Sequence, residues 1–366
     1  MKILQIIPTL RPGGAERFVC EITSALNCKK NIECDILTLN SLTDDDTLHS
    51  SIKGKNIKVI SLKSENIFDK IAVIYRICKE IRKGKYNVVH SHSAAIKYTI
   101  LSTLLFKKVR FVATIHSEAR REAGKGLEKL VKKFMFKHNL CVPVTISEES
   151  LISFEAFYKK TTVMIPNGVS SYDGIADINL KKKDNEILLI HPASCQPVKN
   201  QALLFASFTK LKAKYPNIRL IWYGSNKANL ELFNSMTSYF GNGIEYGGVH
   251  YDIRSTFLVA DAICLSSNME GLPMTIIEAF SVGCPALCTP VGGCRNIISN
   301  GFNGFLSKSN SEEDYTKMLE KFILLTKEQK AEMRDNVLKT FENYHIDNTA
   351  SRYIEVYKSK NSLQRI

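Results

Sequence analysis

The sequence predicts an α/β protein of two domains, each with a parallel sheet covered by helices on both faces. The chain has 366 residues, which is more than one hydrophobic core usually supports. Short apolar runs alternate with longer amphipathic stretches along the whole chain, as they do in βαβ units. This alternation starts again after a polar stretch at residues 170–185. We therefore expect a first domain at 1–168 and a second at 169–345.

Each expected element follows from its own run of residues. In the first domain the strands are expected at 2–7, 33–39, 57–62, 87–90, 110–114 and 140–146, and helices at 16–26 and 69–83. In the second half the strands are expected at 186–191, 218–223, 261–265 and 285–288, and helices at 201–214, 275–282, 316–339 and 349–358. Open parallel sheets bind ligands beyond the carboxyl ends of their strands, so the two sheets are expected to face an interdomain cleft.

Composition indicates a soluble protein with an uneven charge. Hydrophobic residues make up 44% and charged residues 23%, and no apolar run reaches the length of a membrane span. Pro8 interrupts the apolar start, so it is interpreted as a buried strand of a cytoplasmic protein rather than a secretory signal. The ten cysteines form no Cys-x-x-Cys pair and are expected to be reduced. Residues 1–165 hold 28 basic and 16 acidic residues of the net +14, which indicates either an anionic partner there or simple solubility.

The stretch at 266–279 carries the clearest chemistry. It joins an expected buried strand to a loop and a helix, with Glu270 in the loop and Glu278 eight residues later. Gly271 allows close backbone approach, and Pro273 suits the start of a helix. A carboxylate that accepts two hydrogen bonds matches the vicinal hydroxyls of a sugar or ribose. The alternative is a solvated loop glutamate and a helical glutamate in a local ion pair.

This stretch resembles the Glu-x7-Glu signature of family 4 (group 1) retaining glycosyltransferases, which have the GT-B fold of two Rossmann-like domains. Further motifs of that family follow one another from about residue 13 to 306, at 13–16, 166–169, 199–201, 283–285, 291–293 and 301–305. The resemblance implies an enzyme of the hexosyltransferase type that needs no metal or other cofactor. It also implies that the final helix, about 346–366, packs back on the first domain.

The resemblance assigns roles to single residues. Lys199 would neutralise the leaving diphosphate, Glu270 would contact the donor sugar, and His116 would lie near that sugar, so these three are the catalytic candidates. The donor-binding candidates are Gly13, Gly14, Ser194, Lys199, Glu270, Gly271, Leu272, Pro273, Met274 and Glu278, with Glu278 on the ribose hydroxyls. On its residues alone, His116 could equally be a structural histidine.

The sequence departs from the family pattern at two positions. Ser194 stands where the family usually has Arg, and Asn296 stands where Glu is common. A neutral hydroxyl does not replace a bidentate guanidinium on phosphate. Either another cation takes its place, the candidates being Arg11, Arg17 and Arg295, or transfer is slow or absent.

The first domain offers candidates for the acceptor side. His90 and His92 share one strand face, and without a third ligand they are interpreted as acceptor-side residues, together with Arg120, rather than as a metal site. Between residues 120 and 138, Leu127, Leu130 and Phe134 repeat at helical spacing among lysines. That pattern is typical of a helix on an anionic membrane, and also of an ordinary surface helix. The resemblance favours the membrane, while no motif indicates nucleic acid.

These observations together predict transfer of a sugar from a nucleotide-sugar, with UDP expected from the family, and with retention of configuration. The acceptor is expected to be a glycan or a polyprenyl-diphosphate-linked glycan, at the cytoplasmic face of the membrane, in capsule, O-antigen or exopolysaccharide synthesis. Two alternatives stay open: a nucleotide-sugar epimerase on the same scaffold, and a non-catalytic nucleotide- or glycan-binding protein. A nicotinamide enzyme is disfavoured, because no Gly-x-Gly-x-x-Gly follows the first strand.

Overall fold

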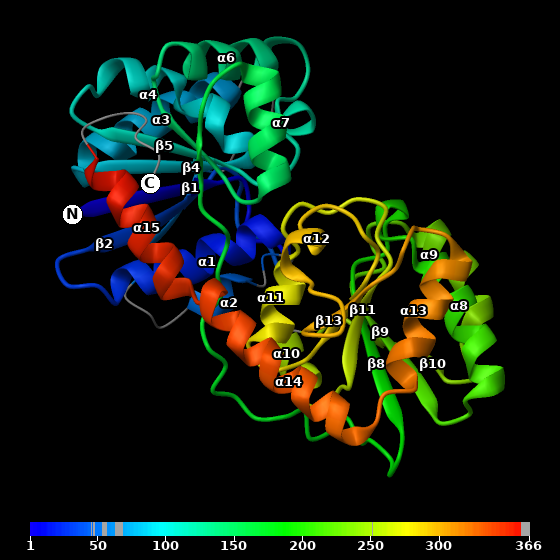
Figure 1. The fold of residues 1–366 in the computed structure, drawn as a ribbon. Coiled ribbons are helices and arrows are strands. Elements are labelled where there is room, and N and C mark those ends of the chain that lie inside the picture. Colours follow the sequence, from blue (N-terminus) through cyan, green and yellow to red (C-terminus); the bar gives the residue numbers. More distant parts are fainter. Residues whose placement is uncertain (45, 47, 53–56, 63–68, 251, 360–366) are drawn as a thin grey trace. The chain divides into compact units, whose positions relative to one another are not determined.

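The computed structural model describes the chain except residues 45, 47, 53–56, 63–68, 251 and 360–366. The chain divides into two compact units, which we call the N-unit, Met1–Ser170 with Tyr344–Ile366, and the C-unit, Ser171–Asn343. Each unit is a parallel sheet with helices on both faces (Figure 1). The predicted fold class of two parallel-sheet, Rossmann-like domains is therefore confirmed.

The described part of the N-unit contains a seven-stranded parallel sheet in the order β3-β2-β1-β4-β5-β6-β7. Its strands are β1 (Lys2–Ile7), β2 (Glu33–Thr38), β3 (Val59–Ser61), β4 (Val88–His92), β5 (Arg110–Ile115), β6 (Val142–Thr145) and β7 (Val163–Met164). Its helices are α1 (Gly14–Asn27), α2 (Leu48–Ile52), α3 (Asp69–Gly84), η1 (Ser93–Thr99), α4 (Ile100–Leu105), α5 (Ala119–Glu122), α6 (Gly126–Lys137), α7 (Glu148–Tyr158) and α15 (Ile346–Lys358).

The described part of the C-unit contains a six-stranded parallel sheet in the order β10-β9-β8-β11-β12-β13. Its strands are β8 (Ile187–Pro192), β9 (Ile218–Tyr223), β10 (Ile244–Gly248), β11 (Ala262–Leu265), β12 (Ala286–Cys288) and β13 (Gly304–Leu306). Its helices are η2 (Pro197–Lys199), α8 (Gln201–Lys214), α9 (Leu230–Met236), η3 (Thr237–Tyr239), α10 (Ile253–Phe257), α11 (Met274–Phe280), α12 (Cys294–Ile297), α13 (Glu312–Ile323), α14 (Lys327–Phe341) and η4, Glu342–Tyr344, which bridges to the N-unit.

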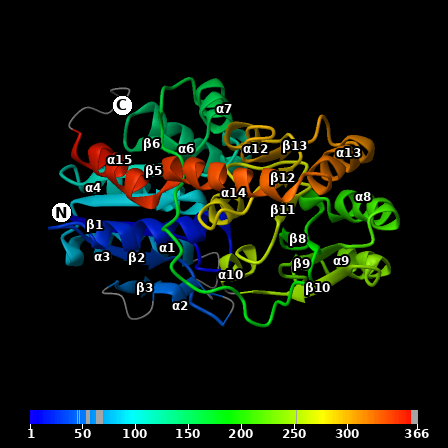
Figure 2. The ribbon, with the colours of Figure 1, turned by 60° about the horizontal axis from the view of Figure 1, so that its bottom comes forward.

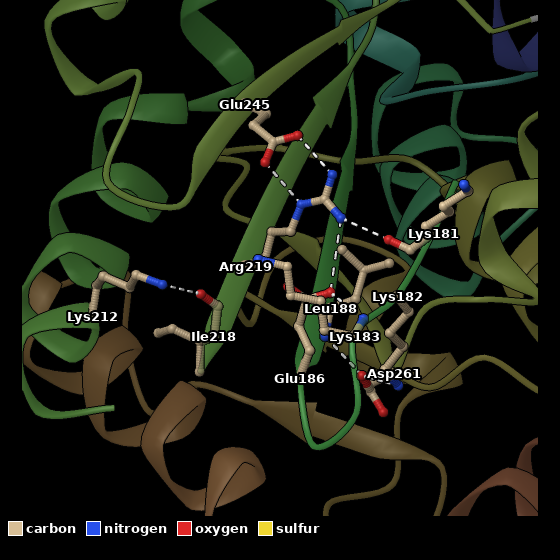
Figure 3. A network of polar contacts seen from close by, with 10 residues as sticks. All are labelled: Lys181, Lys182, Lys183, Glu186, Leu188, Lys212, Ile218, Arg219, Glu245 and Asp261. Atoms are coloured by element: carbon tan, nitrogen blue, oxygen red, sulfur yellow. Dashed lines mark hydrogen bonds and ion pairs between the residues drawn. The ribbon is translucent and has the colours of Figure 1, made fainter. Parts of the chain in front are cut away.

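Ion pairs fix the amino ends of the C-unit strands. Arg219, in β9, makes two hydrogen bonds of 2.8 Å each to the Glu245 carboxylate in β10 (Figure 3). Asp261, just before β11, accepts a 2.7 Å hydrogen bond from the backbone N–H of Leu188 in β8 and pairs with Lys182 at 2.6 Å. These contacts link the four neighbouring strands β10, β9, β8 and β11 in pairs, at the edge opposite the loops that carry the predicted site residues.

The last helix belongs to the N-unit, where α15 packs against α1 (Figure 1 and Figure 2). Two of its side chains, Tyr353 and Tyr357, are buried and reach the sheet. The Tyr353 hydroxyl lies 2.9 Å from Thr114 Oγ1 in β5, and the Tyr357 hydroxyl lies 2.8 Å from His90 Nδ1 in β4. Buried hydroxyls need such partners, so these two contacts fix how the helix lies on the sheet.

Two expected helices are each broken into two. Residues 316–339 fall on α13, which ends at Ile323, and on α14, which Thr326 caps at its start through a capping box with Gln329. Residues 120–138 fall on α5 and α6, separated at Gly124, which has φ +75°. The short strands β7, β10 and β13 were not expected from the sequence, and neither were the helices α2, α4, α7, α9, α10 and α12.

Candidate functional site

The predicted residues gather at the switch point of each sheet. In the N-unit the strand order reverses between β1 and β4, and in the C-unit between β8 and β11. Open α/β sheets bind ligands beyond the carboxyl ends of the strands at these points. The residues that follow those strands and their neighbour β5 are Gly13 and Gly14 after β1, His116 after β5, Ser194 and Lys199 after β8, and Glu270 after β11. Each unit thus contributes its own group of candidates.

Lys199 and Glu270 form an ion pair at the switch point of the C-unit. Lys199 Nζ lies 2.8 Å from Glu270 Oε1, and the Ser267 hydroxyl donates to the same oxygen at 2.6 Å. The Lys199 side chain is 25% exposed and that of Glu270 is 9% exposed. The ammonium can therefore be reached by an anion, while the carboxylate is held in place by two donors.

Backbone contacts tie together the two loops that carry this pair. The Ser266 hydroxyl donates to the carbonyl of Lys199 at 3.0 Å, and the Asn268 N–H donates to the carbonyl of Val198 at 2.8 Å. Thr289, beyond β12, donates through its hydroxyl to the carbonyl of Ser267 at 2.6 Å. The position of Lys199 relative to Glu270 is thus set by backbone as well as by charge.

The Gly292–Gly293 pair supports the Glu270 loop from behind. A Cβ on Gly292, which has φ +53°, would lie 1.9 Å from the carbonyl oxygen of Glu270. The Gly293 N–H donates to the carbonyl of Gly271 at 2.7 Å, and a Cβ on Gly293 would lie 2.5 Å from that oxygen. Only glycine allows so close an approach, so the two glycines set how near the Glu270 loop can lie to the backbone of residues 292–293.

The remaining donor-binding candidates of the C-unit lead into α11. Pro273 precedes the helix, Leu272 and Met274 are buried, and Gly271 is partly exposed. Glu278 lies inside α11 and is only 6% exposed. A carboxylate this deeply buried needs hydrogen-bond donors around it.

Ser194 lies in a loop whose backbone is fixed. The N–H groups of Ala193 and Cys195 donate to the carbonyls of Tyr223 and Ser225 at 2.9 and 2.8 Å. The Ser194 hydroxyl accepts a 3.1 Å bond from Gln196 Nε2 and brings no positive charge. Of the three candidate replacements, Arg11 and Arg17 belong to the N-unit. Arg295 belongs to the C-unit, where it is exposed on α12 directly after the glycine pair.

The structure places His90 and His92 in the core of the N-unit. Both rings are completely buried, with centroids 4.1 Å apart, which confirms that the two side chains share one strand face. His90 is enclosed by Thr114 and by the Tyr357 side chain of α15. The expectation that these histidines line an acceptor surface does not fit this burial, whereas Arg120 is exposed on α5.

His116 lies at the end of β5 and is partly exposed. Its Nε2 is 2.9 Å from His92 Nδ1, and its ring centroid is 5.8 Å from that of Phe18 in α1. Burial lowers the pKa of His116 to about 3, so the ring is neutral near pH 7. Gly13 and Gly14, at the start of α1, are exposed.

Sequence reasoning missed three polar residues of the N-unit. Gln5 and Thr114 each hydrogen-bond a buried histidine, and both stand out as polar residues in otherwise apolar strands. Glu122 accepts hydrogen bonds from the N–H groups of His116 and Ser117 at 2.8 and 3.0 Å and so shapes the loop of His116. Burial raises the pKa of Glu122 to about 7, against the opposing charge of Lys132.

The helix α6 presents an apolar side chain on each turn to solvent. Leu127, Leu130 and Phe134 are 76%, 63% and 47% exposed. Lys132, one of the lysines among them, is buried and pairs with Glu128 at 3.1 Å. No helix in the described part of the chain has both the length and the apolar character needed to cross a bilayer.

Comparison with known families decides the assignment. Residues 12–171 match the family described as Glycosyltransferase Family 4, and residues 175–340 match the one described as Glycosyl transferases group 1. The chain is a family 4 (group 1) glycosyltransferase. The two matches cover the two units of this glycosyltransferase in turn, and its two Rossmann-like domains are those of the GT-B fold.

Two curated relatives of this glycosyltransferase have named acceptors. It is 22% identical over 363 residues to an alpha-1,4-N-acetyl-D-galactosaminyltransferase of Campylobacter jejuni, covering 97% of this chain and 98% of the relative. That enzyme's name gives a GalNAc-containing glycan on diphospho-undecaprenol. The chain is also 24% identical over 343 residues to a UDP-Gal:alpha-D-GlcNAc-diphosphoundecaprenol alpha-1,3-galactosyltransferase of Escherichia coli, covering 86% of both.

Solved structures confirm the fold. A glycosyltransferase from Rickettsia africae superposes with a TM-score of 0.83 at 21% identity, over 98% of this chain and 97% of the other. The Anabaena protein HepE, in complex with UDP and glucose, superposes with a TM-score of 0.79 at 18% identity, over 98% of this chain and 100% of the other.

Proposed function

We propose that this glycosyltransferase moves a sugar from a UDP-sugar to a polyprenyl-diphosphate-linked glycan, with retention of configuration, in the synthesis of a bacterial surface polysaccharide. The names of the Campylobacter and Escherichia relatives support the lipid-linked acceptor, and UDP in the HepE structure supports the nucleotide. The observation that carries the proposal is the Lys199–Glu270 pair at the switch point of the C-unit.

The C-unit binds the donor. Glu278 accepts hydrogen bonds from the ribose, and Glu270 does so from the sugar, with the backbone of Gly271 to Met274 beside it. The diphosphate gains negative charge as it leaves, and the ammonium of Lys199 stabilises that charge where it develops. The sugar passes through an oxocarbenium-like state, and the acceptor hydroxyl attacks from the face that the diphosphate leaves.

Arg295 supplies the positive charge that is lost because Ser194 stands where the family usually has Arg. It is exposed and belongs to the same unit as Lys199, and it follows the glycine pair that backs the Glu270 loop. With two side-chain cations on the diphosphate, no metal is needed, so EDTA leaves turnover unchanged.

The first test removes the Lys199 ammonium. Lys199→Ala is expected to lower turnover of a UDP-sugar about 100- to 1000-fold, the scale of losing one preorganised charge donor. The measurement is release of UDP with an undecaprenyl-diphosphate-linked glycan as acceptor, with and without EDTA. Lys210→Ala is the matched control, because Lys210 lies in α8 and pairs with Glu312 at 2.5 Å, outside the site. Full activity of Lys199→Ala would refute the assignment of Lys199.

The N-unit binds the acceptor and contacts the membrane through α6. The exposed Leu127, Leu130 and Phe134 enter the interface, while Lys129 and Lys133 on the same helix attract anionic headgroups. In this proposal the enzyme works at the inner face of the cell membrane, and Arg120 on α5 contacts the acceptor diphosphate.

Replacing one of these apolar side chains tests the surface. Leu130→Asp is expected to reduce cosedimentation with vesicles of 30% anionic and 70% neutral phospholipid at least tenfold. It removes an apolar contact and adds a charge of the same sign as the lipid. Leu324→Asp, at a 64% exposed leucine of the C-unit, is the control. Equal vesicle binding by the two variants would exclude α6 as the contact.

A further inference from the structure

A chain of buried hydrogen bonds joins three elements of the N-unit and ends at His116. Gln5 in β1 has its Oε1 2.8 Å from His92 Nε2, and His92 Nδ1 is 2.9 Å from His116 Nε2. At the other end, Gln5 Nε2 lies 3.7 Å from Cys34 Sγ in β2. We call this row of four side chains the histidine relay.

Within the histidine relay, the donor and the acceptor of each histidine hydrogen bond can be assigned. Burial lowers the pKa of both His92 and His116, so each neutral ring carries one N–H and one bare nitrogen. The carbonyl oxygen of Gln5 only accepts, so His92 donates to it through Nε2–H and keeps Nδ1 bare. His116 must then donate to that nitrogen through its own Nε2–H. The Nδ1 of His116 is therefore left as a lone pair.

That nitrogen has no partner. His116 Nδ1 is buried and, among the residues that the structure describes, meets no hydrogen-bond donor. Buried acceptors are rarely left unsatisfied, and an exception calls for an explanation, such as a catalytic role or a bound water or ion. Phe18, five residues after Gly13, packs against the rings of both His92 and His116, so the relay adjoins the first turns of α1.

We propose that Gln5 and His92 are positioning residues: they hold His116, which the family resemblance already puts near the sugar, as its Nε2–H tautomer, so that its Nδ1 is the atom that accepts a hydrogen bond from a sugar hydroxyl. The sugar comes from the proposed function, on which this part of the inference depends; the tautomer does not. A site that accepts from a hydroxyl discriminates strongly against a sugar that lacks it. Gln5 and His92 thus influence which sugar binds, although only His116 touches the sugar.

The tautomer is tested by long-range ¹H–¹⁵N NMR of protein labelled with ¹⁵N-histidine, in which the eight histidines are assigned by substitution. We expect the proton of both His92 and His116 on Nε2. His92→Phe, which removes the acceptor and keeps the ring volume, should let His116 populate the Nδ1–H form. His92→Asn places a carbonyl where Nδ1 was and should keep the Nε2–H form. A wild-type His116 protonated at Nδ1, or an unchanged tautomer in His92→Phe, overturns the relay.

The sugar contact is tested separately. Adding the UDP-sugar that the enzyme turns over should shift the bare Nδ1 resonance of His116 upfield, because that nitrogen then accepts a hydrogen bond. His92→Phe should lower kcat/KM for this donor at least tenfold, and His92→Asn should recover most of the loss. No shift of Nδ1 in an enzyme that turns the donor over would overturn the contact and leave the proposed function standing. Failure to turn over any UDP-sugar would overturn the proposed function, while the spectra of the free protein still decide the tautomer.

Discussion

Glu122 shows how one buried carboxyl couples the shape of a loop to pH. Its Oε2 accepts hydrogen bonds from three groups of His116 and Ser117, and burial raises its pKa to about 7. An acid whose pKa is higher in the folded state binds more protons there than in the unfolded chain. Its contribution to stability is therefore greatest below the unfolded value near 4.5 and declines as the pH rises to about 7.

The prediction concerns Glu122→Gln, which keeps a carbonyl acceptor and removes the titration. Relative to wild type, this variant should gain unfolding free energy as the pH rises from 5 to 8, because only the wild type must then bury a charge. Urea unfolding at four pH values in this range measures the difference. A difference that does not change with pH would show that the carboxyl titrates normally.

At the scale of single elements, the packing of α15 on the sheet depends on the hydroxyls of Tyr353 and Tyr357. Tyr357→Phe keeps the ring and removes the hydroxyl that meets His90 Nδ1 at 2.8 Å. Leaving a buried polar group without its partner costs about 1–3 kcal/mol of unfolding free energy. Tyr75→Phe is the control, since Tyr75 is 68% exposed on α3. Equal unfolding midpoints in urea for the two variants would mean that the Tyr357 contact contributes nothing.

Sequence patterns predicted the long elements and missed the short ones. The mainly apolar run at 2–7 is β1 to the residue, because a central strand of a parallel sheet is buried on both faces and is therefore apolar at most positions. β13 has three residues, which is too few to show the alternating pattern of a strand, and its first residue, Gly304, is of a type common in loops. Gly124 breaks the expected helix at 120–138, although the apolar spacing runs on beyond it.

The same limit applies to the site. Spacing alone placed Lys199 and Glu270 in two separate loops, and the ion pair between them needed the sheet order. Spacing also put His90 and His92 on one strand face, but it could not tell the buried face from the open one. α15 settles that question, and it lies more than 250 residues further along the chain.

At the scale of the whole molecule, each unit is assembled around one switch point, and the chemistry is divided between them. The C-unit holds the cations and carboxylates proposed for the donor, whereas the N-unit holds the neutral histidine relay and the exposed face of α6. Most of the positive charge also lies in the first half of the chain, with 28 basic against 16 acidic residues at 1–165. Charge that would attract an anionic lipid surface is thus concentrated in the unit that carries α6.

The discontinuous N-unit has a consequence for how the protein is made. Residues 1–170 leave the ribosome first, but α15 follows only after the whole of Ser171–Asn343. At roughly 5–20 residues per second, that wait lasts roughly 10–35 s. During this time His90 and Thr114 lack the tyrosines that will cover them, and the nascent first sheet is open to water and to chaperones. The unit that begins first is the one that finishes last, so any transcript cut short within the C-unit would leave the N-unit unfinished.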